Sequence, residues 1–353
     1  MTSLATRAVI ATIIGLSASA QLVFGQTIST TGNIPPTILP ERCLIAASAQ
    51  KVIKAPGEKA ERMTLEQLRG DFALWKTAAE QNWPEGQYLI GQCYVYGIEV
   101  AVDKDKAFSY FQKAADSDWL SACVQVGSCY QNGLGVAKDE TAAVKWYRKA
   151  AEQGNALGQY CLGQCYQNGI GVPKDVIEVV KWYRKAAEQG DAASQFSLGD
   201  CYLVGRGVAK DAVEAVKWFR QAAEQGDAAG QSSLGFCYQD GRGIAKDLIE
   251  GVKWYRKAAE QDDATGQRNL GCCYQYARGV SKDEVEAVKW YRKAAEQDDA
   301  IAQRLLGWCY YKGLGLLEDK DEAVRWLSEA ANQGDAEARS RLIVINSKEK
   351  RGK

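Results

Sequence analysis

A ten-residue stretch recurs along this chain at intervals of 36 residues, and this repetition limits the folds that the chain can adopt. Its best-formed copy runs from Lys217 to Gly226, with the sequence KWFRQAAEQG. The same position is held by Leu74, Tyr110, Trp146, Trp182, Trp218, Trp254, Trp290 and Trp326. A fixed period of this length is typical of proteins that stack one small structural unit many times. We therefore predict a repeat array.

Each unit contains two helix patterns joined by glycine-bearing connections. In the unit from Asp191 to Gly226, Asp191 is a suitable N-cap for a first helix, and Gly205 ends that helix. Asp211 begins a second helix, which Gly226 terminates. Small or apolar residues fall at helical spacing on the first helix at Ala192, Phe196, Gly199 and Tyr202. The second helix carries an apolar stripe of Ala215, Val216, Phe219, Ala222 and Ala223. One such pair cannot bury its stripe alone, whereas stacked pairs share a continuous core.

Two motifs of this unit carry a family resemblance. One is the segment Leu162–Asp175, with the pattern LGxxYxxGxGVxKD, and the other is Ala143–Gly154, AVKWYRKAAEQG. Together they resemble the Sel1-like repeat of bacterial proteins, a relative of the tetratricopeptide repeat. The resemblance implies an all-α fold, a right-handed α-solenoid of 36-residue helix-turn-helix repeats. It also implies a protein that holds protein partners.

The array is predicted to span residues 64–347. A capping helix begins at the capping box of Thr64 to Gln67 and ends near Gln81, seven helix pairs follow over 83–334, and a partial first helix comes last. Residues 348–353 form a basic tail polar enough to fray. Residues 26–63 contain four prolines and no sustained helical pattern, and they predict a disordered linker.

The N-terminus has the pattern of an export signal. Arg7 precedes an apolar run over residues 8–16 and a group of small residues at 17–20. We predict a signal peptide over residues 1–25, cleaved before Gln21 or Gln26, and hence a periplasmic or secreted protein. The alternative is an apolar N-terminus that does not direct export, on a cytoplasmic protein. No segment is long and apolar enough to predict a membrane span.

Six residues depart from the glycines of the repeat pattern. Two replace glycines of the connection inside a unit, and four replace the glycine that ends the second helix: Glu99, Ala277, Asn82, Asp118, Asp262 and Asp298. Asparagine and aspartate adopt the left-handed conformation more readily than most residues. We expect these substitutions to affect local connections and to leave the fold intact.

Seven cysteines also recur at intervals of 36 residues, each directly before a tyrosine: Cys93, Cys129, Cys165, Cys201, Cys237, Cys273 and Cys309. One interpretation is a small buried position filled by a compact apolar residue. The other is a ladder of disulfides, which the spacing of about 8–10 Å between packed helices disfavours. Neither zinc-type cysteine pairs nor histidines are present, so we predict no metal site.

Positions that vary between units are candidates for partner recognition. Two columns of the first helix differ from unit to unit, and we predict that partner-binding residues lie among them: Tyr88, Tyr160, Phe196, Phe236, Arg268, Arg304 and Trp308. They run from aromatic to basic along the chain, which would suit an extended or helical peptide with an acidic end. The alternative is that these columns vary only to suit packing between units.

Composition narrows the function further. The 44 basic and 44 acidic residues balance, which argues against nucleic acid as the main partner. The chain has no histidine, the commonest general base. We predict a non-catalytic scaffold or adaptor that binds a protein or peptide, with no cofactor and with an unknown oligomeric state. Two alternatives stay open: a β-lactam-binding or hydrolysing enzyme like some cysteine-rich Sel1-like proteins, and an intracellular signalling adaptor.

Overall fold

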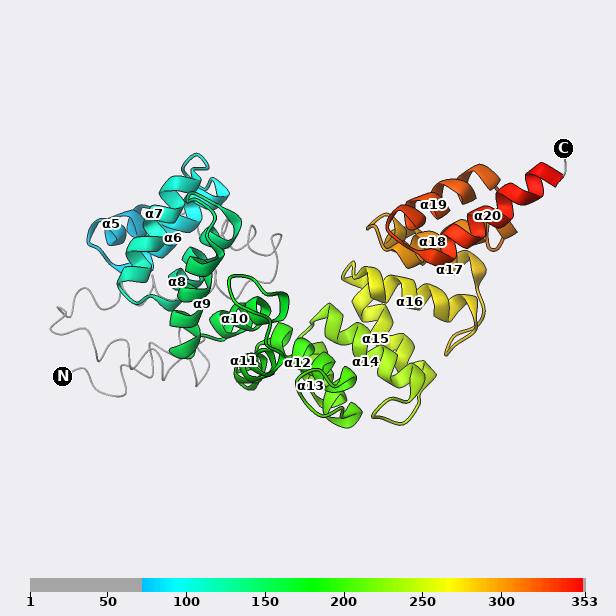
Figure 1. Ribbon diagram of the computed structural model, residues 1–353, viewed down its shortest axis with the longest axis horizontal. Helices are drawn as coiled ribbons and strands as arrows, with labels where there is room; N and C mark the ends of the chain where they lie inside the picture. The colour runs from blue at the N-terminus through cyan, green and yellow to red at the C-terminus, as the bar shows by residue number, and fades with distance from the viewer. Residues whose placement is uncertain (1–71, 352–353) are drawn as a thin grey trace. The chain divides into compact units, whose positions relative to one another are not determined.

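A computed structural model describes residues 72–351, and within this range the chain forms sixteen α-helices and no strand. Figure 1 shows these helices in chain order. The predicted signal peptide, the linker and the capping box at Thr64 lie outside the described residues. No helix within the described range combines the length and the apolar character that a membrane crossing requires.

The helices alternate between two types. We call the first helix of each repeat the A helix and the second the B helix. The A helices are α6 (Pro84–Tyr96), α8 (Leu120–Asn132), α10 (Ala156–Asn168), α12 (Ala192–Val204), α14 (Ala228–Asp240), α16 (Ala264–Gln275), α18 (Ala300–Lys312) and α20 (Ala336–Arg351). The B helices are α5 (Phe72–Glu80), α7 (Lys104–Asp116), α9 (Glu140–Glu152), α11 (Val176–Glu188), α13 (Ala212–Glu224), α15 (Leu248–Glu260), α17 (Glu284–Ala295) and α19 (Lys320–Asn332).

The described chain divides into two compact units. The first comprises residues 72–158 and 170–172, and the second comprises residues 159–169 and 173–351. The second unit contains most of α10 and all helices from α11 to α20, and with them six of the seven predicted partner-binding residues. Tyr88 lies in the first unit.

The cap and the terminator predicted for the second helix of the unit 191–226 are both present. Asp211 caps α13, because its Oδ1 accepts hydrogen bonds from the backbone N–H groups of Val213 and Glu214, each at 3.0 Å. The predicted terminator Gly226 has a φ of 92°. At the C-terminal end, α20 continues to Arg351. The residues 348–351 that were predicted to fray are therefore helical, in continuation of α20.

All six residues that replace a glycine of the repeat pattern have a left-handed backbone conformation. Within the described residues, a positive φ outside glycine occurs at Asn82, Glu99, Asp118, Asp262, Ala277 and Asp298, with values between 55° and 64°. The repeat therefore keeps its connection geometry even where glycine is lost. This result fits the expectation that the substitutions leave the fold intact.

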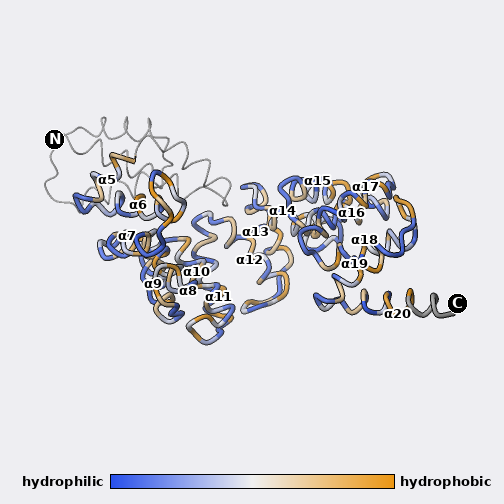
Figure 2. The backbone as a smooth tube through the Cα atoms, turned by 90° about the horizontal axis from the view of Figure 1, so that it is seen from above, coloured by the Kyte–Doolittle hydropathy of each residue, from blue (hydrophilic) through white to orange (hydrophobic). Residues whose placement is uncertain are grey.

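The hydrophobic core lies at the junctions between repeats. One cluster joins Val216 and Phe219 of α13 to Leu234 and Cys237 of α14, and Trp254 of the following B helix packs against it. The predicted stripe on α13 is buried in full. Figure 2 shows that apolar and polar residues alternate along the helices, as amphipathic packing requires. Because each cluster needs two successive repeats, a single repeat has no complete core.

Burial on the A helices extends beyond the small or apolar positions that fall at helical spacing. On α12 the buried residues are Ser194, Gln195, Leu198, Gly199 and Cys201. Of the four positions noted in the sequence, Gly199 is therefore buried, whereas Ala192, Phe196 and Tyr202 are half-buried, and the last two pack against the core. The reason is that α12 contacts α11, α13 and α14, so its environment comes from three neighbours. A single stripe of apolar residues therefore does not identify all the residues that this helix buries.

A glycine on each A helix from α6 to α18 makes room for a large side chain of the B helix in the same repeat. A Cβ atom added to Gly199 would lie 2.7 Å from the ring of Phe219, and one added to Gly271 would lie 2.7 Å from the ring of Tyr291. These distances are shorter than any van der Waals contact between carbon atoms. The glycine thus sets how closely the two helices approach.

We expect Gly199→Ala to destabilise the second unit by about 1–3 kcal/mol, because the added methyl group overpacks the contact with Phe219. Gly226→Asn is the matched control, since a Cβ there meets no atom within 4 Å and Asp262 and Asp298 hold the equivalent position. Urea denaturation followed by circular dichroism measures both variants. Equal midpoints for the two variants would contradict the steric role of Gly199.

Candidate functional site

Successive A helices of the second unit lie side by side, and each leaves one face open. Helix α14 contacts both α12 and α16 directly. Half-buried or exposed residues along these helices form what we call the A-layer: Ser197, Asp200 and Val204; Ser233, Phe236 and Asp240; Asn269, Cys272 and Tyr276; Leu305, Trp308 and Lys312. Three of them, Phe236, Cys272 and Leu305, also pack against core clusters with part of their side chains. This layer is the candidate binding surface.

Most predicted site residues lie between repeats and outside this layer. Tyr88 is 2% exposed, and its hydroxyl accepts a hydrogen bond from Gln92 at 2.9 Å. Tyr160 and Phe196 are half-buried, with ring centroids 5.7 Å from Tyr183 and 6.1 Å from Phe219. Each of these three rings packs against a B-helix ring of its own repeat, which for Tyr88 is Phe111. Their role in partner binding stays a prediction, and their placement fits the packing alternative.

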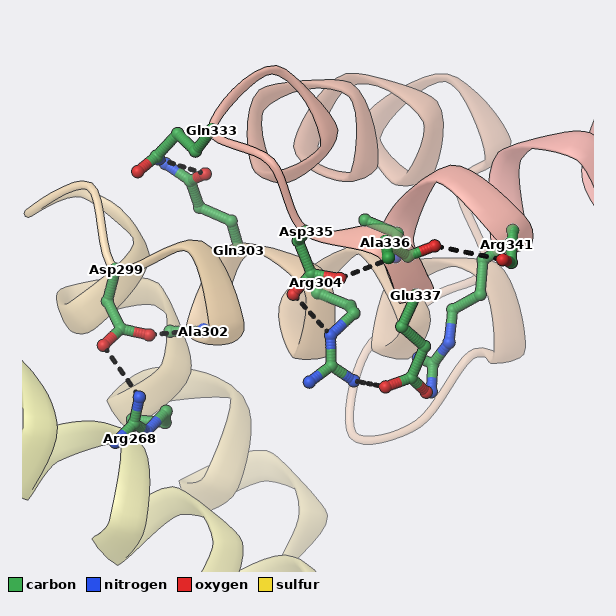
Figure 3. A network of polar contacts seen from close by, with 12 residues as sticks. Arg268, Asp299, Ala302, Gln303, Arg304, Gln333, Asp335, Ala336, Glu337 and Arg341 are labelled. Carbon is green, nitrogen blue, oxygen red and sulfur yellow. Dashed lines mark hydrogen bonds and ion pairs between the residues drawn. The ribbon is translucent and has the colours of Figure 1, made fainter.

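The two arginines of the same column are paired within the fold (Figure 3). Arg268 Nη1 lies 3.1 Å from Oδ2 of Asp299, and Arg304 Nε lies 2.9 Å from Oδ2 of Asp335. Arg304 Nη1 also lies 2.6 Å from Glu337. Each aspartate caps the next A helix through its other oxygen, as the bond from Ala302 N–H to Asp299 Oδ1 at 2.7 Å shows. These arginines therefore brace the caps of the following repeat.

In the two repeats before Arg268, the same position is held by the uncharged residues Phe196 and Ser232. Ser232 donates to Asp263 Oδ2 at 2.6 Å and so takes the place of the arginine. At Phe196 no polar group is available for the next cap, Asp227. Burial raises the pKa of Asp227, and the nearby Asp263 and Asp191 raise it further. The cap of Asp335 differs: burial alone would raise its pKa, but the bonds from the Ala338 N–H and Arg304 outweigh burial and lower it.

A glutamine ladder crosses the same junctions, and the sequence patterns did not identify it as structural. Gln195 of α12 donates to the carbonyl of Ala187 at 3.1 Å and accepts from Gln225 at 2.7 Å. Figure 3 shows the equivalent pair Gln303 and Gln333, 2.9 Å apart. Each rung connects three consecutive helices. The signal in the sequence is a glutamine repeated every 36 residues at Gln159, Gln195, Gln231, Gln267 and Gln303.

The remaining two predicted site residues do lie in the A-layer. Phe236 and Trp308 occupy one column with Asp200 and Cys272, and all four are half-buried. The guanidinium carbon of Arg242 lies 4.6 Å from the ring centroid of Phe236. Lys312 and Arg341 lie 5.0 Å and 4.4 Å from a ring of Trp308. The structure therefore brings aromatic rings and cations together in this column.

Sequence reasoning missed the arginines that line this column. They stand between the two connection glycines, or at the equivalent place, in three successive repeats: Arg206, Arg242 and Arg278. Other repeats have Ile98, Leu134, Ile170 and Leu314 at this position. The change from apolar to basic at one repeat position was the available signal.

The cysteine column is buried throughout the described residues. All seven members are at most 7% exposed, and the ten described cysteines are free thiols. Burial raises the pKa of Cys201 and Cys237 to about 11. The disulfide ladder is therefore not formed among the described residues, and the cysteines act as compact core residues. Within residues 72–351 no group of three or more His, Cys, Asp or Glu residues could hold a metal ion. Cys43 lies outside the described range.

Comparison with protein families matches seven consecutive segments to the Sel1 repeat, at residues 84–119, 120–155, 156–191, 192–227, 228–263, 264–299 and 300–335. The chain belongs to the Sel1 repeat family. The predicted family resemblance and the all-α repeat fold are thereby confirmed.

Two solved structures support the assignment to the Sel1 repeat family. A protective antigen present in uropathogenic Escherichia coli strains, described as having an SLR fold, is 31% identical, with a TM-score of 0.64 over 86% of this chain and 67% of that one. A Sel1 repeat protein from Oxalobacter formigenes is 35% identical, with a TM-score of 0.64 over 69% of this chain and 96% of that one. No curated protein matches the chain.

We expect Arg304→Gln to lower stability by about 1.5–3 kcal/mol at pH 7, because Arg304 and Asp335 are only 14% and 11% exposed and the cap loses its partner. The lowered pKa of Asp335 makes this contribution present above the usual value of 3.8 and lost as the pH falls through the folded-state pKa. The difference from wild type should therefore shrink in acid.

The control for this prediction is Arg325→Gln. Arg325 is 58% exposed and pairs with Glu322 and Glu329 on the surface of α19, where a pair contributes about 1 kcal/mol or less. Urea denaturation between pH 3 and pH 7 provides the measurement. If Arg304→Gln leaves the midpoint unchanged at pH 7, the bracing role is wrong and the residue is free for a partner.

Proposed function

We propose that this Sel1 repeat protein is a non-catalytic scaffold that binds a protein or peptide partner on the A-layer of its second unit. One observation carries the proposal. Core positions repeat from unit to unit, whereas one half-buried column of the A-layer holds four different residue types: Asp200, Phe236, Cys272 and Trp308. Phe236 and Cys272 use part of their surface to pack against core clusters. The part of each residue that stays accessible is where recognition of one partner would use the variation.

The physical character of the A-layer supports the proposal. It combines half-buried aromatic rings with cations at cation–π distance, a composition that protein interfaces favour. It also extends over several consecutive A helices, so it suits an elongated partner segment better than a small molecule. The family assignment adds support, because repeat arrays of stacked helix pairs commonly present extended binding surfaces.

Site-specific crosslinking tests this proposal. We expect p-benzoylphenylalanine placed at Ser233 or Asn269, in the A-layer, to form a discrete adduct with one partner in cells that naturally produce the protein. The matched controls place it at Lys217 or Lys253, which are exposed on the B helices. Adducts of equal yield from both sets, or none from the A-layer, would overturn the proposal.

The proposed scaffold works outside the cytoplasm, in the periplasm or as a secreted protein. The support is the N-terminal pattern of a basic residue, a short apolar run and small residues before Gln21 and Gln26. Intact-mass measurement of the natively expressed protein provides the test. A chain that begins at Gln21 or Gln26 is the expected result, and an unprocessed chain would instead place the scaffold in the cytoplasm.

A further inference from the structure

The three arginines at the equivalent connection position have different environments in the second unit. Arg206 Nη1 lies 3.5 Å from Oδ2 of Asp200, six residues earlier on the A helix. Arg242 instead stacks over Phe236, which holds the same position in the next repeat. Arg278 lies 5.8 Å from the ring centroid of Tyr276. These arginines therefore reach back from the connection onto the A-layer.

Their ion pairing differs between the repeats. Arg206 pairs with Asp200 and the 51% exposed Arg242 pairs with Asp240, each with 3.5 Å between the nitrogen and the oxygen. Arg278 is exposed and has no ion-pair partner within residues 72–351. The exposed Lys312, which lies over Trp308, likewise has no ion-pair partner in this range. Positive charge is thus left uncompensated toward the C-terminal repeats.

Arg268 and Arg304, by contrast, contribute little to this charge. Each is under 20% exposed and is paired to the cap of the following A helix. The cations available to a partner are therefore those of the connections and of the end of α18. With the adjacent rings they form what we call the cationic–aromatic strip: Phe236, Arg242, Tyr276, Arg278, Trp308 and Lys312.

We propose that the cationic–aromatic strip binds an acidic peptide segment of a protein partner. This inference rests on the proposed scaffold function and specifies the chemistry of its partner. A guanidinium stacked on a ring has its face covered, while the N–H groups at its edge stay available to a carboxylate. Carboxylates bind this edge through two parallel hydrogen bonds. The rings beside the arginines offer apolar surface to the side chains between the carboxylates.

The repeat spacing specifies the segment further. Equivalent positions on α14 and α16, which are in direct contact, are separated by about one interhelical distance, roughly 8–10 Å. A segment in the polyproline II conformation has three residues per turn and rises about 3.1 Å per residue. Carboxylates at every third residue of such a segment lie on one face, about 9 Å apart, and would therefore reach Arg242 and Arg278 in succession. A regularly acidic segment in this conformation thus uses both arginines together.

Fluorescence polarisation with the full chain tests the proposal. The probe is a fluorescein-labelled 15-residue peptide with glutamate at every third position and neutral polar residues between. The control peptide has glutamine in place of each glutamate. We expect the glutamate peptide to bind at least about tenfold more tightly than the glutamine peptide. Its binding should weaken as salt is raised, because the contacts are exposed to solvent.

Charge-matched variants locate the binding site. Arg242→Gln with Arg278→Gln should weaken glutamate-peptide binding about tenfold or more. Lys246→Gln with Lys282→Gln removes the same charge from the same two connections, where Lys282 pairs with Glu284 at 2.7 Å at the start of α17. This control pair should change binding by less than about threefold. Thermal unfolding midpoints of both double variants verify that they are folded.

Three outcomes of the binding measurements, and one of the crosslinking, would overturn the proposal. The first three are read from peptide and oligonucleotide binding. They are equal binding of the two peptides, equal loss in the two double variants, and strip-dependent binding of oligothymidine without binding of the glutamate peptide. The last would indicate that the rings and cations recognise single-stranded nucleic acid. If the A-layer crosslink at Ser233 persists unchanged in the Arg242→Gln and Arg278→Gln variant, the scaffold function stands and the acidic partner is wrong.

Discussion

Close contact between helices across and within the repeats is the constraint on which the rest of this structure depends. An A helix can approach its B helix closely because a glycine faces a large side chain, as Gly199 faces Phe219. An A helix can approach the preceding B helix because alanines and small residues meet there, as Gly230 meets Ala222. Both contacts leave no room for an added methyl group. The regular stacking, and with it the side-by-side arrangement of the A helices, follows from this close approach.

Polar groups buried by this stacking are satisfied in a way that joins neighbouring repeats. The glutamine ladder uses Gln195 to link the end of α11 to Gln225 at the end of α13. A buried amide without partners would cost free energy, so each glutamine of the ladder favours the arrangement in which both neighbouring helices are in place. Apolar packing provides most of the driving force for stacking, and the ladder selects the register in which it occurs.

The sequence predicts the parts of this structure that recur. A period of 36 residues, the apolar stripe of the B helix, the aspartate caps and the left-handed positions such as Asp262 all follow from local rules. The buried face of the A helix does not, because three neighbouring helices share it and periodicity alone cannot assign one side to each.

The candidate site shows the same limit. The two variable columns of the first helix predicted Phe236 and Trp308, which do lie in the A-layer. The same columns also predicted Arg268 and Arg304, which instead form ion pairs inside the fold. From sequence, a free arginine and a paired arginine look alike. The distinction depends on a partner 31 residues away, Asp299 for Arg268, whose position only the packed repeats define. Arg242 and Arg278 were overlooked because they belong to connections, where variation is usually attributed to loose constraints.

In the C-terminal repeats, the arginine that stabilises each A-helix N-cap always comes from the preceding repeat. Asp335, at the start of α20, is held by Arg304 from α18, whereas Asp299, at the start of α18, is held by Arg268 from α16. Each helix start thus depends on the repeat before it and not on the repeat after it. Loss of α20 leaves the cap of α18 intact, but loss of α16 releases the cap of α18. We therefore expect unfolding in this region to begin at α20 and to proceed toward α16, because the loss of each helix leaves the caps of the helices before it in place.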